Sequence, residues 1–100
     1  MIEIRQSDEF TDWLMRLRDF QARAKIVTRI LRLANGNAGD SRSVGDGIVE
    51  LKISYGPGYR VYFISRGAVL IVLLCGGDKS TQAKDIRRAK ELAAKLKQEE

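Results

Sequence analysis

Hydrophobic spacing in the first half of the chain predicts one strand and two helices. Ile2 and Ile4 alternate with polar residues, which is typical of a short strand. Between residues 10 and 17, apolar side chains recur at intervals of three and four, as on one face of a helix that Ser7 can cap. A second helix with a wide apolar face is expected from about residue 22 to residue 34.

The second half of the chain changes to a period of two and predicts three strands. Residues 49–53 and 61–63 alternate between apolar and polar, whereas residues 69–74 are continuously apolar, as in a strand covered on both faces. Short glycine-containing turns separate the three segments, at residues 55–58 and 66–67. We therefore expect an antiparallel meander.

A final helix is expected after the last strand, capped by Ser80 or Thr81 and ending near Lys97. Residues 35–47 are rich in Gly, Asn, Asp and Ser and are expected to form a loop. The predicted order is β-α-α-β-β-β-α in one α+β domain spanning residues 1–100. Its helices would pack on a small, mostly antiparallel, twisted sheet.

Composition limits the chemistry that the chain can perform. With 100 residues and 44% hydrophobic content, it fits one domain with a packed core. It has no His and one Cys, Cys75, which excludes a Ser-His-Asp triad, a zinc hydrolase and a thiol–imidazole protease. We expect no metal and no cofactor, and a buried structural role for Cys75.

Charge and targeting give weaker indications. The chain carries 18 Lys and Arg against 13 Asp and Glu, a formal charge of +5. That balance suits a polyanion such as nucleic acid, and it equally suits ordinary surface solubility. The longest apolar run, residues 68–75, is too short to span a bilayer, and residues 1–5 do not resemble a signal peptide. We expect a cytoplasmic protein with no membrane partner.

The hairpin around Gly56 carries the most distinctive chemistry. In a symmetric register Lys52 lies opposite Arg60, and Glu50 lies opposite Tyr62, all on one face. Like charges directly opposite each other destabilise a sheet by up to about 1 kcal/mol, and such a broken rule can mark a functional site. Two cations would suit a phosphate. The alternative is a solvated strand face whose charges only aid solubility.

Further cations follow the third strand of the meander. Lys79 stands where that strand ends and either converges on the same face or is a charged turn residue. The pair Gly76–Gly77 lacks the fuller pattern of a phosphate-binding loop and is read as a strand exit. Lys84, Arg87 and Arg88 lie largely off the apolar stripe of the final helix.

Three motifs give the chain a family resemblance. These are residues 47–53 (GIVELKI), 56–63 (GPGYRVYF) and 74–79 (LCGGDK), followed by Gln82, Asp85 and Ile86. Together they resemble addiction-module killer proteins, a HigB-like branch of the RelE/ParE toxin superfamily. The resemblance covers essentially the whole chain. It implies a type II toxin that is neutralised by a cognate antitoxin, typically a helix-turn-helix protein. RelE-like members cleave mRNA on the ribosome, whereas ParE-like members inhibit DNA gyrase.

The resemblance also implies roles for individual residues. Arg60 matches the Arg of the family's Tyr-Arg strand, Lys52 matches one of two catalytic lysines, and Lys79 approximately matches the basic residue after the last strand. Two positions depart from the pattern. Glu50 stands where the other lysine is expected, and the C-terminal Tyr that RelE uses has no counterpart, its place falling near Asp85. The mechanism of RelE therefore does not transfer intact.

These residues fit the attack of an RNA 2′-hydroxyl on the adjacent phosphate without a metal. Arg60 and Lys52 would stabilise the developing charge, and Glu50 or a lysine would accept the proton. Lys79 would hold the phosphate or assist the leaving oxygen. Further RNA contacts are expected from Tyr62, Lys84, Arg87 and Arg88. The alternatives are a ParE-like gyrase inhibitor, or a degenerate protein that only binds nucleic acid or antitoxin.

Overall fold

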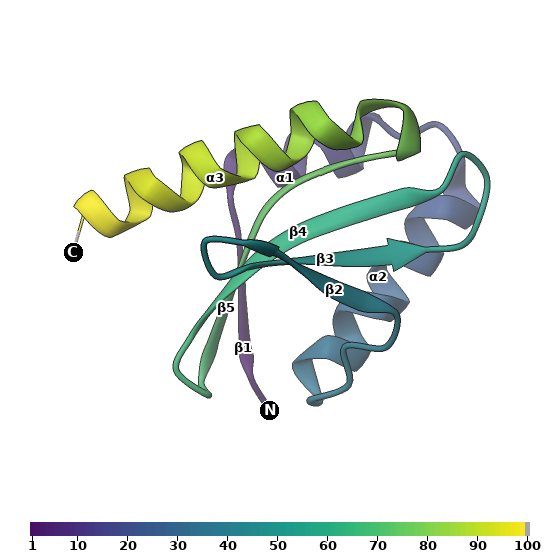
Figure 1. Cartoon of the computed structure of the whole chain (residues 1–100). Coiled ribbons are helices and arrows are strands. Elements are labelled where there is room, and N and C mark those ends of the chain that lie inside the picture. Colours follow the sequence, from purple (N-terminus) through teal and green to yellow (C-terminus); the bar gives the residue numbers. More distant parts are fainter. Residues whose placement is uncertain (100) are drawn as a thin grey trace.

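The computed structural model describes residues 1–99. It shows a twisted five-stranded sheet with helices packed on both of its faces (Figure 1). The strands, in spatial order, are β1 (Glu3–Gln6), β5 (Leu70–Gly77), β4 (Tyr59–Arg66), β3 (Ile48–Ile53) and β2 (Ser41–Gly45). The helices are α1 (Asp8–Arg16), α2 (Phe20–Ala34) and α3 (Gln82–Gln98), and a short 3-10 turn, η1 (Lys79–Thr81), precedes α3. β1 runs parallel to β5 and every other pairing is antiparallel, so the α+β class is confirmed.

Side-chain caps set where the first two helices begin. The Ser7 hydroxyl accepts a hydrogen bond from the Phe10 N–H at 3.0 Å, as its position predicted. Asp19 does the same for α2, accepting from the N–H groups of Gln21 and Ala22 at 3.0 and 3.1 Å. This second cap explains why α2 begins two residues earlier than the apolar periodicity indicates.

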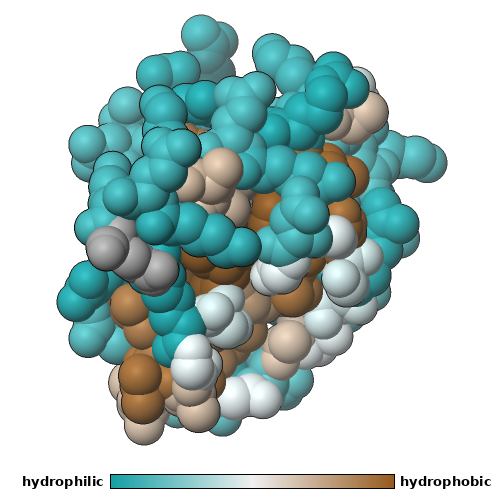
Figure 2. Space-filling view, turned by 60° about the vertical axis from the view of Figure 1, so that its left-hand side comes forward, coloured by the Kyte–Doolittle hydropathy of each residue, from teal (hydrophilic) through white to brown (hydrophobic). Residues whose placement is uncertain are grey.

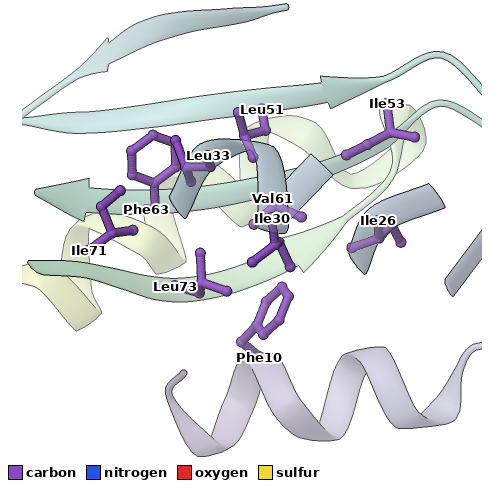
Figure 3. Close-up of a cluster of buried hydrophobic side chains, with 10 residues drawn as sticks. All are labelled: Phe10, Ile26, Ile30, Leu33, Leu51, Ile53, Val61, Phe63, Ile71 and Leu73. Carbon is purple, nitrogen blue, oxygen red and sulfur yellow. The ribbon is translucent and has the colours of Figure 1, made fainter. Parts of the chain in front are cut away.

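One hydrophobic core lies between the sheet and the helices α1 and α2 (Figure 3). Phe10 of α1 is fully buried against it, together with Leu51, Val61 and Leu73 of the central strands. Alternate residues of β3 and β4 supply this face, which is what their period of two predicts. The remaining members are Ile26, Ile30, Leu33, Ile53, Phe63 and Ile71.

A second core lies on the opposite face, under α3. Ala89 and Ala93 are buried there, and because they are small the helix approaches the sheet closely. They cover Ile48, Tyr62 and Leu74, among others. β4 and β5 are therefore covered on both faces, as the continuous apolar run in β5 predicted.

The predicted loop over residues 35–47 is wrong in part, because it contains the edge strand β2. β2 pairs antiparallel with β3, so that Arg42 lies opposite Glu50. Asp46 and Gly47, with φ of 55° and 78°, make the connecting turn. Asp-Gly is a strong hairpin signal. The strand before it has no apolar alternation, because a strand at the sheet edge has little apolar surface to bury.

The two glycines that end β5 allow close packing on both sides of the strand. A Cβ at Gly76 would overlap the Trp13 ring of α1, and a Cβ at Gly77 would overlap the Asp85 carboxylate of α3. The pair therefore serves helix–strand packing.

The start of α3 also differs in detail from its predicted cap. Asp78 caps η1, accepting from the N–H of Ser80 at 2.8 Å. Thr81 occupies the N-cap position of α3 but makes no capping bond there, because its hydroxyl donates to Asp85 instead.

Among residues 1–99 no helix combines the length and hydropathy that a membrane crossing needs.

Candidate functional site

The register of the β3–β4 hairpin is the one that the sequence predicted. Lys52 lies opposite Arg60 and Glu50 lies opposite Tyr62. The turn between the strands depends on Gly58, whose φ is 80° and whose Cβ, if present, would lie 3.0 Å from Nη1 of Arg60. Glycine is needed here both for the backbone geometry and to leave room for the guanidinium.

The solvated strand face expected as the alternative is wrong for three of these four residues. Tyr62, Glu50 and Arg60 are only 0%, 2% and 6% exposed, because α3 covers this face of the sheet. Lys52 remains exposed. Buried charges of this kind need partners.

Glu50 is the centre of a hydrogen-bonded network that joins four elements. Its Oε1 accepts from Nε of Arg42 at 2.9 Å and lies 4.0 Å from Nε of Arg60. Its Oε2 accepts from the Tyr62 hydroxyl at 2.9 Å and from Nε2 of Gln82 at 3.0 Å. Burial alone would raise the pKa of Glu50, but the hydrogen bonds from Arg42, Gln82 and Tyr62 outweigh it and hold the pKa below its ordinary value.

These contacts bear on the roles expected for Glu50 and Tyr62. Glu50 is a poor acceptor for an RNA proton, because its oxygens already accept three hydrogen bonds and its charged form is favoured. Tyr62 is fully buried, so its side chain offers no surface to a ligand in this conformation. Burial, together with the Glu50 carboxylate, raises the pKa of the Tyr62 phenol, so it stays a neutral hydrogen-bond donor.

Sequence reasoning gave no role to Arg42 or Gln82. Arg42 was hidden in the predicted loop, and the Asp46–Gly47 turn was the signal that could have placed it opposite Glu50. Gln82 belongs to the motif that carries the family resemblance, but its contact with Glu50 spans 32 residues of sequence. No local pattern reveals such a contact.

Arg60 has an unusual environment for an arginine. Its Nη1 donates to the Gly58 carbonyl, but its buried Nε has no hydrogen-bond partner among the described residues. A buried donor left unpaired costs about 1–3 kcal/mol, so an orphan of this kind calls for an explanation. The acceptor that faces it is Oε1 of Glu50, 4.0 Å away, so the ion pair with Glu50 offsets part of this cost.

A cavity of about 380 Å³ brings Arg60 and Lys52 together. Arg42 adds a third cation to its lining, against the carboxylates of Asp40 and Glu50. Because Glu50 is already engaged by Arg42, Tyr62 and Gln82, the exposed Lys52, with Arg60 opposite it, is the cation best placed to meet an anion in the cavity.

Lys79 lies beside this cavity. Its backbone N–H donates to the Pro57 carbonyl at 3.4 Å, and its Cβ lies 3.6 Å from where a Cβ on Gly58 would be. The side chain is exposed. Lys79 therefore packs against the turn that holds Arg60, although it is not one of the residues that line the cavity.

The structure does not bring the other predicted RNA contacts to the same place. Lys84, Arg87 and Arg88 line a separate cavity of about 510 Å³ between α1 and α3. Arg88 is also engaged there, with Glu9 at 2.7 Å and Glu91 at 2.9 Å. These three cations therefore form a surface distinct from the Lys52–Arg60 cavity.

Cys75 is buried, as its apolar neighbours predicted. It is 4% exposed, and its Sγ donates to the Asp85 carbonyl at 3.6 Å. Burial raises the pKa of the thiol to about 12. Cys75 is therefore a protonated thiol at neutral pH and a weak nucleophile.

No cluster of three or more His, Cys, Asp or Glu within residues 1–99 is arranged to hold a metal ion.

The lowered pKa of Glu50 predicts how stability depends on pH. An acid whose pKa is lower in the folded state contributes stability above its unfolded pKa, about 4.3 for Glu, and loses it as the pH falls through the folded value. Urea unfolding between about pH 7 and about pH 3 should therefore show a smaller acid loss for Glu50→Gln than for wild type. Glu99→Gln, at an exposed position, is the control, and equal acid slopes for wild type and Glu50→Gln would contradict the assignment.

Comparison with known proteins gives three similarities. A model of the phage-derived Gp49-like family (DUF891) matches residues 12–98. A Haemophilus influenzae protein, described as uncharacterized, is 55% identical over 95 residues, which are 95% of this chain and 96% of that protein. The free Escherichia coli toxin RelE, carrying two Arg-to-Ala substitutions, has a similar fold, with a TM-score of 0.69 at 10% identity over 86% of this chain and 90% of RelE.

Proposed function

The chain belongs to the phage-derived Gp49-like family of the RelE toxin superfamily, and we propose that it is a type II toxin that cleaves mRNA on the ribosome. The family and the fold support a toxin-type function. The observation that carries the catalytic part of the proposal is the cavity that buried Arg60 lines together with the exposed Lys52.

In the proposed reaction, the 2′-oxygen of a ribose attacks the adjacent phosphorus, and the bond from phosphorus to the next 5′-oxygen breaks. Negative charge grows on the non-bridging oxygens, where Arg60 and Lys52 donate hydrogen bonds. One donor aimed at such charge contributes about 3–4 kcal/mol. The Lys52 amine accepts the 2′-proton, and the Lys79 ammonium group donates a proton to the leaving 5′-oxygen.

Glu50 acts in this proposal as a positioning residue. Its carboxylate holds Arg42 and Gln82 and lies 4.0 Å from Arg60, so it fixes the cations around the cavity. The ribosome would hold the RNA in a reactive geometry, since positioning alone supplies about 7–11 kcal/mol of barrier reduction. Positioning by the ribosome and charge stabilisation by the toxin would together suffice for a site with few reacting groups.

The proposal includes the HigB-like branch and a helix-turn-helix antitoxin as the cognate partner. Both rest on the three motifs around Lys52, Arg60 and Lys79, and the charge of +5 suits an acidic neutralising segment. Co-expression with the protein of the adjacent open reading frame should restore growth, and the two should copurify. Failure of both neighbouring proteins to bind would oppose the partner assignment.

Pulse-labelling after induction tests the activity directly. We expect protein synthesis to stop before DNA synthesis, with new transcript ends inside translated messages. If DNA synthesis stops first and messages stay intact, the ParE-like alternative replaces the ribonuclease. If neither synthesis changes, the protein is a binding protein without toxin activity of its own.

Cys75→Ala is expected to keep growth inhibition and to lose a little stability. The thiol is buried and protonated and lies outside the cavity of Lys52 and Arg60, so removing it leaves only a small void. The expected cost is about 1 kcal/mol, seen as a lower Tm. Loss of toxicity at unchanged Tm would give Cys75 a functional role instead.

A further inference from the structure

Arg29 of α2 uses its side chain to bind the backbone of two other segments of the chain. Hydrophilic side chains cover much of the face shown in Figure 2, as is usual for a solvated surface. Arg29 is instead partly buried. Its Nη1 donates to the Lys52 carbonyl at 2.6 Å, and its Nη2 donates to the carbonyls of Ala38 and Asp40 at 3.0 and 3.1 Å. One guanidinium therefore joins α2, the loop before β2, and β3.

The same contacts hold both polar backbone groups of Lys52. Its N–H donates to the Asp40 carbonyl at 2.9 Å, while its own carbonyl accepts from Arg29. Asp40 lies one residue before β2, where the ladder between β2 and β3 ends. Arg29 therefore fastens the end of this ladder at the residue that carries the exposed lysine of the cavity. We call this set of hydrogen bonds among Arg29, Ala38, Asp40 and Lys52 the Arg29 clip.

The Arg29 clip needs both an arginine and a glycine. A guanidinium is planar and carries its donors in a fixed fork, so it can serve carbonyls from two segments, whereas a lysine ammonium is a single point. Gly39 lies between the two loop carbonyls with φ of 64°, and a Cβ there would lie 3.2 Å from Nη2 of Arg29. A side chain at residue 39 would therefore strain the backbone and push the loop away from the guanidinium.

The clip lies behind the wall of the candidate cavity. Asp40 and Lys52 line that cavity, but Arg29 does not. Arg29 instead lines a separate cavity of about 350 Å³, together with Lys25 and Arg32. Arg29 therefore acts on the candidate site through the backbone of Lys52 and Asp40.

We propose that Arg29 is a positioning residue of the cleavage site, which fixes the backbone of Lys52 and the loop that carries Asp40. This inference rests on the proposed function, in which the Lys52 amine accepts the 2′-proton. The position of the Lys52 backbone sets where that amine can reach. A misplacement of about 1 Å can lower a rate by about 10²-fold. The alternative role for an arginine on this basic helix is a direct contact with phosphate.

Amide hydrogen exchange, measured by NMR on the free protein, tests the clip itself. In Arg29→Lys and in Gly39→Ala, the Lys52 amide should exchange at least about tenfold faster than in wild type, while the amides of β4 and β5 keep their protection. Gly67→Ala is the matched control, because Gly67 has nearly the same φ, 63°, and nothing within 4 Å of a Cβ. Unchanged exchange of the Lys52 amide in both clip variants would overturn the proposal.

Cleavage on ribosomes programmed with a short message tests the role in the reaction. Arg29→Lys and Gly39→Ala should each lower kcat by about 10–100-fold and leave KM within about threefold of wild type. Arg32→Ala, which removes an exposed arginine from the same helix, should change kcat by less than about threefold. If Arg29 bound phosphate through its charge, Arg29→Lys would keep full activity, and Arg29→Ala and Arg32→Ala would raise KM alike. That result would overturn the positioning role.

The two measurements keep this inference distinct from the proposed function. If wild type cleaves no message, the proposed function fails, and the positioning role fails with it even where the exchange data support the clip. If wild type cleaves and Arg29→Lys cleaves equally well with an open clip, the positioning role alone is overturned. A circular dichroism melt of each variant checks that it is folded at the assay temperature, and if Gly39→Ala does not fold, Arg29→Lys decides.

Discussion

Lys52→Ala is expected to lower mRNA cleavage by about 10²–10³-fold and to relieve growth arrest while the fold stays intact. Lys52 is exposed on β3, so its truncation opens no core cavity. Removing one of two like charges opposite each other should even stabilise the hairpin slightly. The measurement is the mapping of transcript ends after induction, with a circular dichroism melt of the same variant.

Arg60→Ala should lose cleavage to the same degree, but this variant should also lose stability. The sequence places Arg60 on an open polar face, where truncation would be harmless. The structure shows it 6% exposed, under α3 and close to Glu50, so truncation also leaves a void beside a buried carboxylate. Lys52→Ala is therefore the cleaner test of the site, and Arg60→Lys keeps the charge while removing the planar fork.

The matched control is Lys97→Ala, an exposed lysine at the far end of α3 that is absent from the lining of the cavity. It should cleave and arrest growth like wild type. If Lys52→Ala and Arg60→Ala both fold and both cleave at the wild-type rate, the proposed site is wrong. If wild type arrests growth without any cleavage, the enzyme assignment fails while the toxin function stands.

Local pattern predicts most of the strands and their register. The period of two in β3 and β4 and the symmetric turn around Gly56 place Lys52 opposite Arg60, because side chains alternate strictly along a strand. β2 escapes the same reasoning. An edge strand buries little apolar surface, so its sequence stays polar. The Asp46–Gly47 turn is the local feature that indicates a hairpin there.

The environment of the site could not be predicted from local pattern. Helical spacing shows that Ala89 and Ala93 share a face, but it does not show which side of the sheet that face covers. That choice buries Glu50 and Arg60 and brings Gln82 into hydrogen-bonding distance of Glu50. The same limit explains Arg88, which spacing groups with other cations although Glu9, 79 residues away, engages it in the fold.

Glu50→Ala is expected to destabilise the protein by about 3 kcal/mol, because removing one partner of a buried charged network leaves the others unpaired. Tyr62 and Gln82 would lose their acceptor, and Arg60 would lose the carboxylate nearest its guanidinium. Urea unfolding at neutral pH gives this number. Tyr62→Phe is the matched control, since it removes one hydrogen bond of the network and leaves the charge in place.

Glu50→Gln separates a positioning role from a catalytic one. Gln keeps the shape and one acceptor oxygen, so the variant should fold with a smaller loss of stability than Glu50→Ala. If Glu50 positions the cations, cleavage should stay within about tenfold of wild type and keep the same pH profile. If Glu50 were the proton acceptor, cleavage would fall by about 10²–10⁴-fold and the acidic limb of the pH profile would disappear. That result would return Glu50 to the reaction and remove Lys52 from the role of base.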